Sequence, residues 1–329
     1  MPHNGCPHMC SFCNQRVISG QQAQPTVQQV QATLKTALQQ MGSSRAKNAE
    51  IAFFGGSFTA INKDYMQALL ACAAEFLPFF GGIRISTRPD CIDVEILTLL
   101  KTYGVTAIEL GAQSMNDSVL AANLRGHTVQ DVVTASALIK SHGFELGLQM
   151  MTGLYTSTPD DDFATAEQIA ALQPNTVRVY PTVVLKNTYL HSLFLQGEYT
   201  PPDINSTAEL CAKLIDLFEV QHNIPIIRMG LHAADSIQED FATGVYHPAF
   251  RELAEGVWFK NKLLQLLAQK GLAATPGKIT AVNVFVNSRS LSKLVGQKKC
   301  NLQFFASIGF GVNVFVDDGL GHRMLEIRD

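Results

Sequence analysis

Apolar and polar positions alternate with two different periods along the first 230 residues. Short apolar runs rich in β-branched residues predict six strands, at 51–54, 83–86, 107–110, 146–150, 177–180 and 224–229. Between them, apolar positions three or four residues apart predict amphipathic helices, for example over 27–41 and 66–77. Strands that alternate with helices predict a parallel sheet with right-handed crossovers. We therefore expect an α/β fold, a partial (β/α)6 TIM-like barrel with its site at the carboxyl ends of the strands.

Helix-start signals support this division. Thr158-Pro159 predicts a cap followed by a proline at the first helical position. Ser206 with Glu209 has the spacing of a capping box and predicts a helix start there.

The pattern changes after residue 245. A helix over 248–270, a strand over 279–286 and two short strands at 312–316 and 324–327 are predicted. We expect two domains, a barrel over 1–245 and a small C-terminal α+β appendage over 246–329.

The composition restricts the class of protein to which the chain can belong. The chain is 47% apolar and 16% charged, which is typical of a folded protein, and its net charge of −3 gives no overall basic field. We find no signal-peptide pattern and no apolar run of membrane-spanning length, so we expect no membrane association. Seven cysteines, three of them crowded into 6–13, do not resemble a paired disulfide framework and favour a cytoplasmic location.

Cys6, Cys10 and Cys13 form the strongest motif. Three thiols at these spacings, with Gly5 and Pro7 keeping the backbone out of a helix, can hold one compact metal centre. An iron–sulfur cube held by three thiolates leaves one iron open. The alternative is a zinc site that His3 or His8 completes.

The motif Cys-x3-Cys-x2-Cys, with Phe12 before the last cysteine, resembles the signature of radical S-adenosylmethionine (SAM) enzymes. The resemblance implies a [4Fe–4S] cluster on Cys6, Cys10 and Cys13, with SAM on the fourth iron and its adenine against Phe12. It also implies reductive cleavage of SAM to a 5′-deoxyadenosyl radical, and a reducing partner such as flavodoxin or ferredoxin.

Polar residues and glycines at later strand ends extend the resemblance. Gly55-Gly56-Ser57 follows the first predicted strand, where the family receives the amino group of SAM. Gln113, Arg125 and Gln149 resemble residues that hold the ribose and carboxylate in the coproporphyrinogen-oxidase branch, although the family often has aspartate where Gln149 stands. Alternatively, Gln113 is a buried, satisfied amide and Arg125 a surface charge.

A closer resemblance is to the radical domain of the Elongator subunit 3 family. The stretches that carry it are 54–58, 87–90, 125–128 and 180–184. The tail lacks the acetyl-CoA-binding glycine signature of that family, so acetyl transfer is not implied. The family also places a barrel strand ahead of the cysteine loop, and because Cys6 follows Met1 by five residues, we expect that strand to be missing.

The sequence thus predicts a radical SAM enzyme acting on an unknown substrate, a small molecule or tRNA. Two alternatives stay open: a haem- or cluster-carrying binding protein like chaperones of the coproporphyrinogen-oxidase branch, and a tRNA-modifying enzyme.

Overall fold

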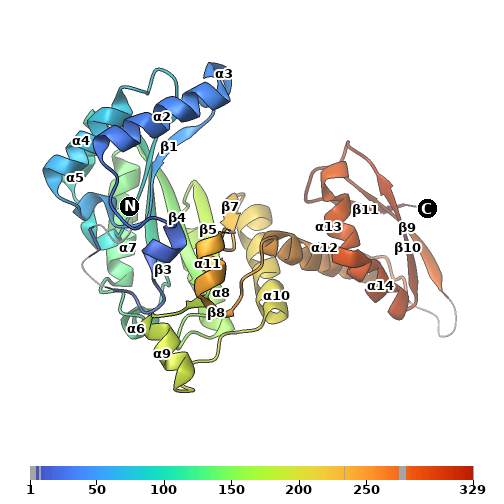
Figure 1. The fold of residues 1–329 in the computed structure, drawn as a ribbon. Coiled ribbons are helices and arrows are strands. Elements are labelled where there is room, and N and C mark those ends of the chain that lie inside the picture. The colour runs from blue at the N-terminus through green and yellow to red at the C-terminus, as the bar shows by residue number, and fades with distance from the viewer. Residues whose placement is uncertain (1–4, 7–8, 233, 274–278, 329) are drawn as a thin grey trace. The chain divides into compact units, whose positions relative to one another are not determined.

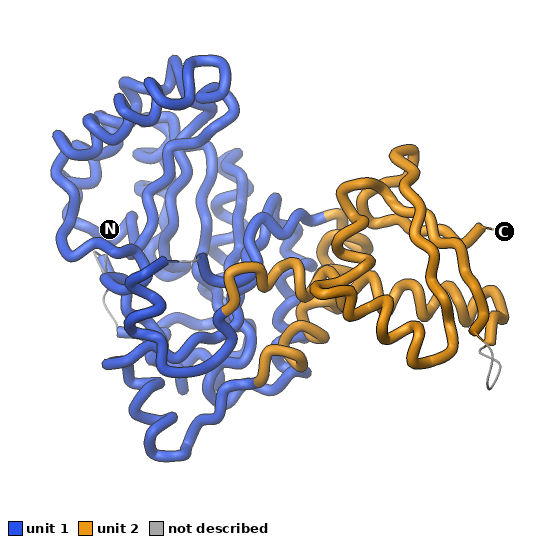
Figure 2. The backbone as a smooth tube through the Cα atoms, turned by 45° about the vertical axis from the view of Figure 1, so that its right-hand side comes forward, with its two compact units in different colours: residues 1–202, 224–246 blue, residues 203–223, 247–329 orange. Residues whose placement is uncertain are grey.

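The computed structural model describes residues 5–6, 9–232, 234–273 and 279–328. The chain forms two compact units (Figure 2). Unit 1 comprises Met1–Pro202 and Ile224–Tyr246, and unit 2 comprises Asp203–Asn223 and His247–Asp329. Within the described part of the chain, no helix is long and apolar enough to cross a membrane.

A six-stranded parallel sheet forms the centre of unit 1 (Figure 1). Its strands, in spatial order, are β1 (Glu50–Phe53), β2 (Gly82–Thr87), β3 (Val105–Gln113), β4 (Glu145–Thr152), β5 (Thr176–Pro181) and β7 (Ile226–Met229). All six predicted strands and the α/β class are confirmed. The described residues include no strand before β1.

The sheet is curled into a partial barrel. Although β1 and β5 are separated by three strands, the Arg178 guanidinium of β5 lies 5.1 Å from the ring centroid of Phe54, which follows β1. Such a contact requires the inner face to be concave. Both faces are covered, as is usual for parallel strands, and eight of the nine residues of β3 are buried.

Helices pack on the outer face between the strands (Figure 1). The longer ones are α2 (Val27–Met41), α4 (Lys63–Ala74), α5 (Val94–Thr102), α7 (Val129–Ser141) and α8 (Pro159–Ala171). Unit 1 also contains short helices elsewhere along the chain: α1 (Gln15–Ser19), α3 (Ser43–Ala46), α6 (Asp117–Ala122), α9 (Tyr189–Leu195), α11 (Asp235–Asp240), η1 (Phe58–Ala60) and η2 (Pro89–Cys91). Thr158 caps α8 and Pro159 is its first residue, as predicted.

One additional sheet in unit 1 was not predicted. β6 (Val183–Leu185) pairs antiparallel with β8 (Phe241–Gly244). Val183 and Leu185 pack with Val17 of α1 and Ile237 of α11. This small sheet therefore supports the segment that follows the cysteine loop.

Unit 2 is an α+β unit, as the fold prediction for the tail required. Its sheet has the order β10 (Phe310–Val316), β9 (Thr280–Val286), β11 (Leu325–Arg328), with β9 parallel to β10 and antiparallel to β11. Its helices are α10 (Ile204–Ile215), α12 (Phe250–Gln269), α13 (Leu291–Val295) and α14 (Cys300–Ser307), with short helical turns η3 (Asp216–Gln221), η4 (Ser288–Ser290) and η5 (Gln297–Lys299).

Two details differ from the sequence-based expectation. The division into 1–245 and 246–329 leaves 203–223 in the barrel, whereas these residues group with unit 2 because α10 packs along α12. The predicted capping box is wrong. Asp203 caps α10 by accepting from the amides of Asn205 and Ser206, so the helix begins earlier and Glu209 instead bonds Lys260.

Candidate active site

The cysteine loop is tied to the barrel through Ser11. The Ser11 amide donates to the Asn123 carbonyl over 3.1 Å, and its hydroxyl donates to Asn123 Oδ1 over 2.7 Å. Its carbonyl accepts from the Leu190 amide over 2.8 Å. Ser11 and Asn123 are fully buried. The middle of the loop therefore has a fixed position against two separate segments of unit 1.

Glycine is required at one end of the loop. Gly5 has a φ of +70°, and a Cβ at this position would lie 2.2 Å from the Ser57 carbonyl oxygen. The loop backbone therefore runs directly against the segment that follows β1.

The three thiols of the loop line one cavity of about 510 Å³ in unit 1. Burial raises the pKa of Cys6, and burial together with the neighbouring Cys10 raises the pKa of Cys13 to about 12. Thiols in such surroundings stay protonated unless a cation binds them, and a coordinating metal deprotonates a thiol.

The glycine pair after β1 opens onto the same cavity. Gly55 and Gly56 line it, and Gly55 has a φ of +103°, which side chains other than glycine rarely adopt. Ser57 does not line the cavity. It is fully buried, and its hydroxyl bonds Thr87 Oγ1 over 2.9 Å, so its side chain supports the β1–β2 junction.

Gln113 and Arg125 carry polar atoms without partners. Gln113, at an irregularity of the β3–β4 pairing, has a φ of +68°. Among the described residues its buried Oε1 accepts no hydrogen bond, and the Nε of Arg125 donates none. Arg125 donates to the Cys10 sulfur over 3.0 Å and to the Gly111 carbonyl over 2.6 Å. The prediction that Arg125 could be a surface charge is wrong, since it is 6% exposed.

Phe12 and Gln149 complete the predicted set. Phe12 lines the cavity and packs against the clusters around Leu190 and Met151. Gln149 lines it from β4, and its Nε2 donates to Glu109 Oε2 over 3.0 Å. Nine of the ten predicted site residues thus line one cavity, Ser57 being the exception.

Glu109 is a residue that sequence reasoning missed. It lies on β3 with 1% of its side chain exposed, and Arg178 donates two hydrogen bonds to it over 2.7 and 2.9 Å. Arg84 approaches it to 3.7 Å. This carboxylate therefore orients both Arg178 and Gln149 on the inner face of the sheet.

The donor set fits an iron–sulfur cluster. Cys6, Cys10 and Cys13 face one cavity together with orphaned polar atoms, and no acidic residue lines it. Within the described residues, no group of three His, Cys, Asp or Glu converges on a point that one metal ion could occupy. Thiolates that bind separate corners of a cube need not converge in this way. His3 and His8, which the zinc alternative requires, lie outside the described residues.

The chain is similar in sequence to several known proteins and protein families. The family model of the radical SAM superfamily matches residues 1–169, and that of the radical SAM C-terminal domain matches 174–257. A tRNA uridine(34) acetyltransferase of Dehalococcoides mccartyi is 30% identical over 169 residues, 48% of this chain and 37% of that protein. Human Elongator complex protein 3 is 28% identical over 66% of this chain and 43% of its own.

A solved structure gives the same fold. The Elp3 protein of Methanocaldococcus infernus, with residues 1–46 deleted, matches 78% of this chain and 66% of its own, with a TM-score of 0.61 and 21% identity. The chain spans less than half the length of the two curated relatives. Since the first family model covers just over half of the chain, the protein belongs to the radical SAM superfamily.

Proposed function

We propose that the chain is an enzyme that holds a [4Fe–4S] cluster on Cys6, Cys10 and Cys13 and cleaves SAM reductively. The observation that carries this proposal is the opening of all three thiols into the cavity that Gly55 and Gly56 also line. When bound, the cluster and SAM supply a 5′-deoxyadenosyl radical that abstracts hydrogen from a substrate.

The remaining residues of the cavity suit a nucleoside with an amino acid attached. Phe12 offers an apolar ring for an adenine, and the backbone at Gly55 and Gly56 can approach an ammonium group closely. The unpartnered Oε1 of Gln113 can accept from a ribose hydroxyl, and the unpartnered Nε of Arg125 can donate to an anionic oxygen.

Reconstitution tests the proposal. Full-length protein treated anaerobically with iron and sulfide should take up about four irons per chain. Dithionite and SAM should then release 5′-deoxyadenosine. A fully loaded cluster that releases none would overturn the proposal.

A matched pair of variants gives the control. Cys13→Ala should lose the cluster. Cys300→Ala, which removes an exposed cysteine of unit 2 outside the cavity, should take up iron as the wild type does.

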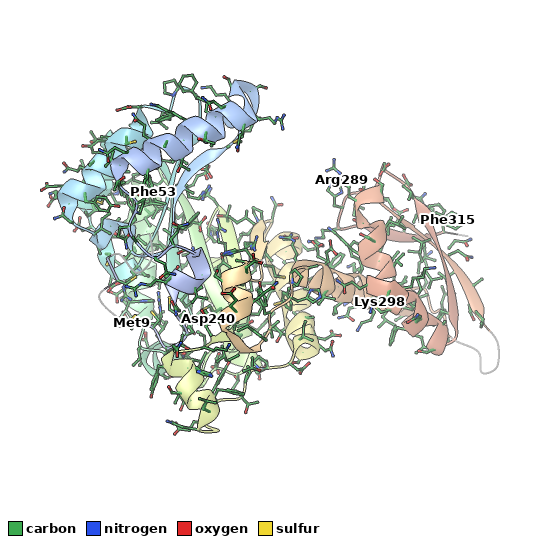
Figure 3. All side chains as sticks on the ribbon, viewed as in Figure 1. Met9, Phe53, Asp240, Arg289, Lys298 and Phe315 are labelled. Carbon is green, nitrogen blue, oxygen red and sulfur yellow. The ribbon has the colours of Figure 1, made fainter. Side chains whose placement is uncertain are left out.

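A second candidate function is tRNA modification. It is supported by the similarity to the tRNA uridine(34) acetyltransferase of Dehalococcoides mccartyi. Residues 247–329 are also positively charged, because they hold eleven Lys and Arg against six Asp and Glu. Lys298, which is labelled in Figure 3, and the neighbouring Lys299 are exposed. Replacing both with Glu should abolish a tRNA gel shift, whereas the double variant Lys35→Glu, Lys47→Glu, with the same charge change, should keep it. No shift of wild-type protein at low salt would exclude this candidate.

Haem binding, the reducing partner and the cellular location stay predictions. Haem binding would be favoured by a stable complex without turnover, and flavodoxin or ferredoxin as reductant is testable by replacing dithionite. Because the thiols must remain reduced to bind iron, we expect the protein to function in a reducing compartment such as the cytoplasm.

A further inference from the structure

Four arginines line the cavity of unit 1, and no aspartate or glutamate lines it. Arg88 is neutralised by Asp90, to which it donates two hydrogen bonds of 2.9 Å. Arg178 is neutralised by Glu109, which lies behind the cavity wall. These two cations therefore add little net charge to the cavity.

The other two arginines differ in what they contact. Arg125 donates to the Cys10 sulfur and contributes to the electrostatic surroundings of Cys6 and Cys13. Arg228 has no such partner. Its Nε donates to the Gly230 carbonyl over 2.9 Å, and among the described residues it forms no ion pair within 4.0 Å. Its two terminal nitrogens therefore hold an unbalanced charge at the cavity wall.

Arg228 lies on β7, at the end of the sheet opposite β1. Its Cα pairs in register with that of Arg178 on β5, and Leu231 and His232 continue the same wall. The residues suited to SAM come from the cysteine loop, from the ends of β1 and β3, and from the segment after α6 that holds Arg125. Arg228 is therefore left for a second molecule.

We infer that Arg228 binds an anionic group, a carboxylate or a phosphate, of the substrate on the β5–β7 side of the cavity. A half-buried guanidinium without a counter-ion loses part of its hydration and gains no opposite charge in return, whereas an anion can balance the charge through two parallel hydrogen bonds to the terminal nitrogens. The inference rests on the proposed function, because it names the substrate class of the same cavity.

Calorimetric titration of the reconstituted full chain tests the inference without turnover. Inorganic phosphate and succinate are the probes, and neutral succinamide is the blank. We expect one of the two anions to bind wild-type protein at least about tenfold more tightly than Arg228→Gln, with Arg228→Lys in between. Arg45→Gln removes an exposed arginine of α3 and should bind as the wild type does. Which anion binds distinguishes a phosphate from a carboxylate substrate.

A second measurement does not depend on the variant folding. Phenylglyoxal modifies free guanidinium groups, and peptide mapping of wild-type protein gives the rate at Arg228. That rate should fall at least about threefold in the preferred anion, while the rate at Arg45 should not change.

Equal binding by wild type and Arg228→Gln, or no protection of Arg228 by either anion, would overturn the inference. Release of 5′-deoxyadenosine by wild-type protein is assayed separately. Its absence would count against the proposed function and leave the anion result to stand or fall by itself.

Discussion

The two walls of the cavity differ in how their polar groups are satisfied. The cysteine side consists of loops and strand ends, and it keeps three thiols and the unpartnered atoms of Gln113 and Arg125. The inner face of the strands, by contrast, ties Glu109 to Arg178 and Gln149. The cysteine side keeps polar groups free for a ligand, whereas the polar groups of the inner face, Arg228 excepted, mostly bond one another. Removing a residue should therefore abolish binding on the first wall and reduce stability on the second.

The largest expected effect is on the cysteine side. Cys10→Ala should reduce iron uptake from about four per chain to near zero, because two thiolates cannot hold the cube. The free energy of unfolding of the cluster-free protein should fall by about 1–3 kcal/mol at most, the cost of leaving the Arg125 donor without the Cys10 sulfur. Iron analysis and urea unfolding measure the two quantities. Iron retention near the wild-type level would contradict the assignment of ligand binding to the cysteine side.

Glu109→Gln should mainly reduce the stability of the fold, not the uptake of iron. It leaves Arg178 and Arg84 facing an uncharged amide, so we expect a loss of about 3–5 kcal/mol in the free energy of unfolding, measured in urea on the cluster-free protein. Glu95→Gln, which removes a carboxylate that pairs with Lys63 on the exposed surface, should cost less than about 1 kcal/mol. Similar losses in the two variants would mean that the inner face is not the stabilising wall.

His127 should make stability depend on pH. Burial, with Arg125 and Arg88 nearby, lowers its pKa from 6.5 to about 4. Between pH 6.5 and pH 4 the His127 side chain binds a proton in the unfolded chain but not in the folded chain. Its contribution therefore lowers the free energy of unfolding by up to about 3 kcal/mol as the pH falls from 6.5 to 4.

His127→Gln removes the titrating group and keeps a donor near the Ala112 carbonyl. Its unfolding free energy should fall less steeply than that of the wild type over this range in urea titrations. Parallel curves would show that His127 does not titrate as its surroundings indicate.

The smallest effect concerns the anchor of the loop. Ser11→Ala removes the hydroxyl that donates to Asn123 and should cost about 1 kcal/mol in unfolding free energy. Iron uptake should slow without being lost, because the backbone bonds of Ser11 remain. Ser141→Ala removes an exposed hydroxyl whose bond stays within its own helix turn, and it is the control. An unchanged uptake rate in Ser11→Ala would show that the backbone bonds alone position the loop.

The fold was predictable where the pattern is local. All six barrel strands followed from short apolar runs, and the cap at Thr158 followed from its residue type and the proline after it. β6 escaped prediction because three residues carry too little periodicity, and its partner β8 lies more than fifty residues away. The cap of α10 was misplaced because Asp203 and Ser206 are both good capping residues. Only the structure shows that the backbone amides at the helix start donate to Asp203.

The site, like the fold, was predictable where its signals are local and not where its contacts join distant residues. The cysteine spacing and the glycine pair are each a short continuous motif, so the resemblance to a family could be recognised, and that resemblance implied that both motifs serve one site. Glu109 stands within an apolar run, and its partner Arg178 is 69 residues later, so no local signal joins them. Arg228 lies within the predicted strand 224–229, and no local signal singles it out. Its unbalanced charge depends on which acids the fold brings near the other arginines.

Electron paramagnetic resonance of the reduced, reconstituted protein tests the central claim most directly. If the three thiols hold a cluster with one open iron facing the cavity, adding SAM should change the spectrum of the reduced cluster, because SAM binds that iron. A fully loaded cluster whose spectrum is the same with and without saturating SAM would contradict the account.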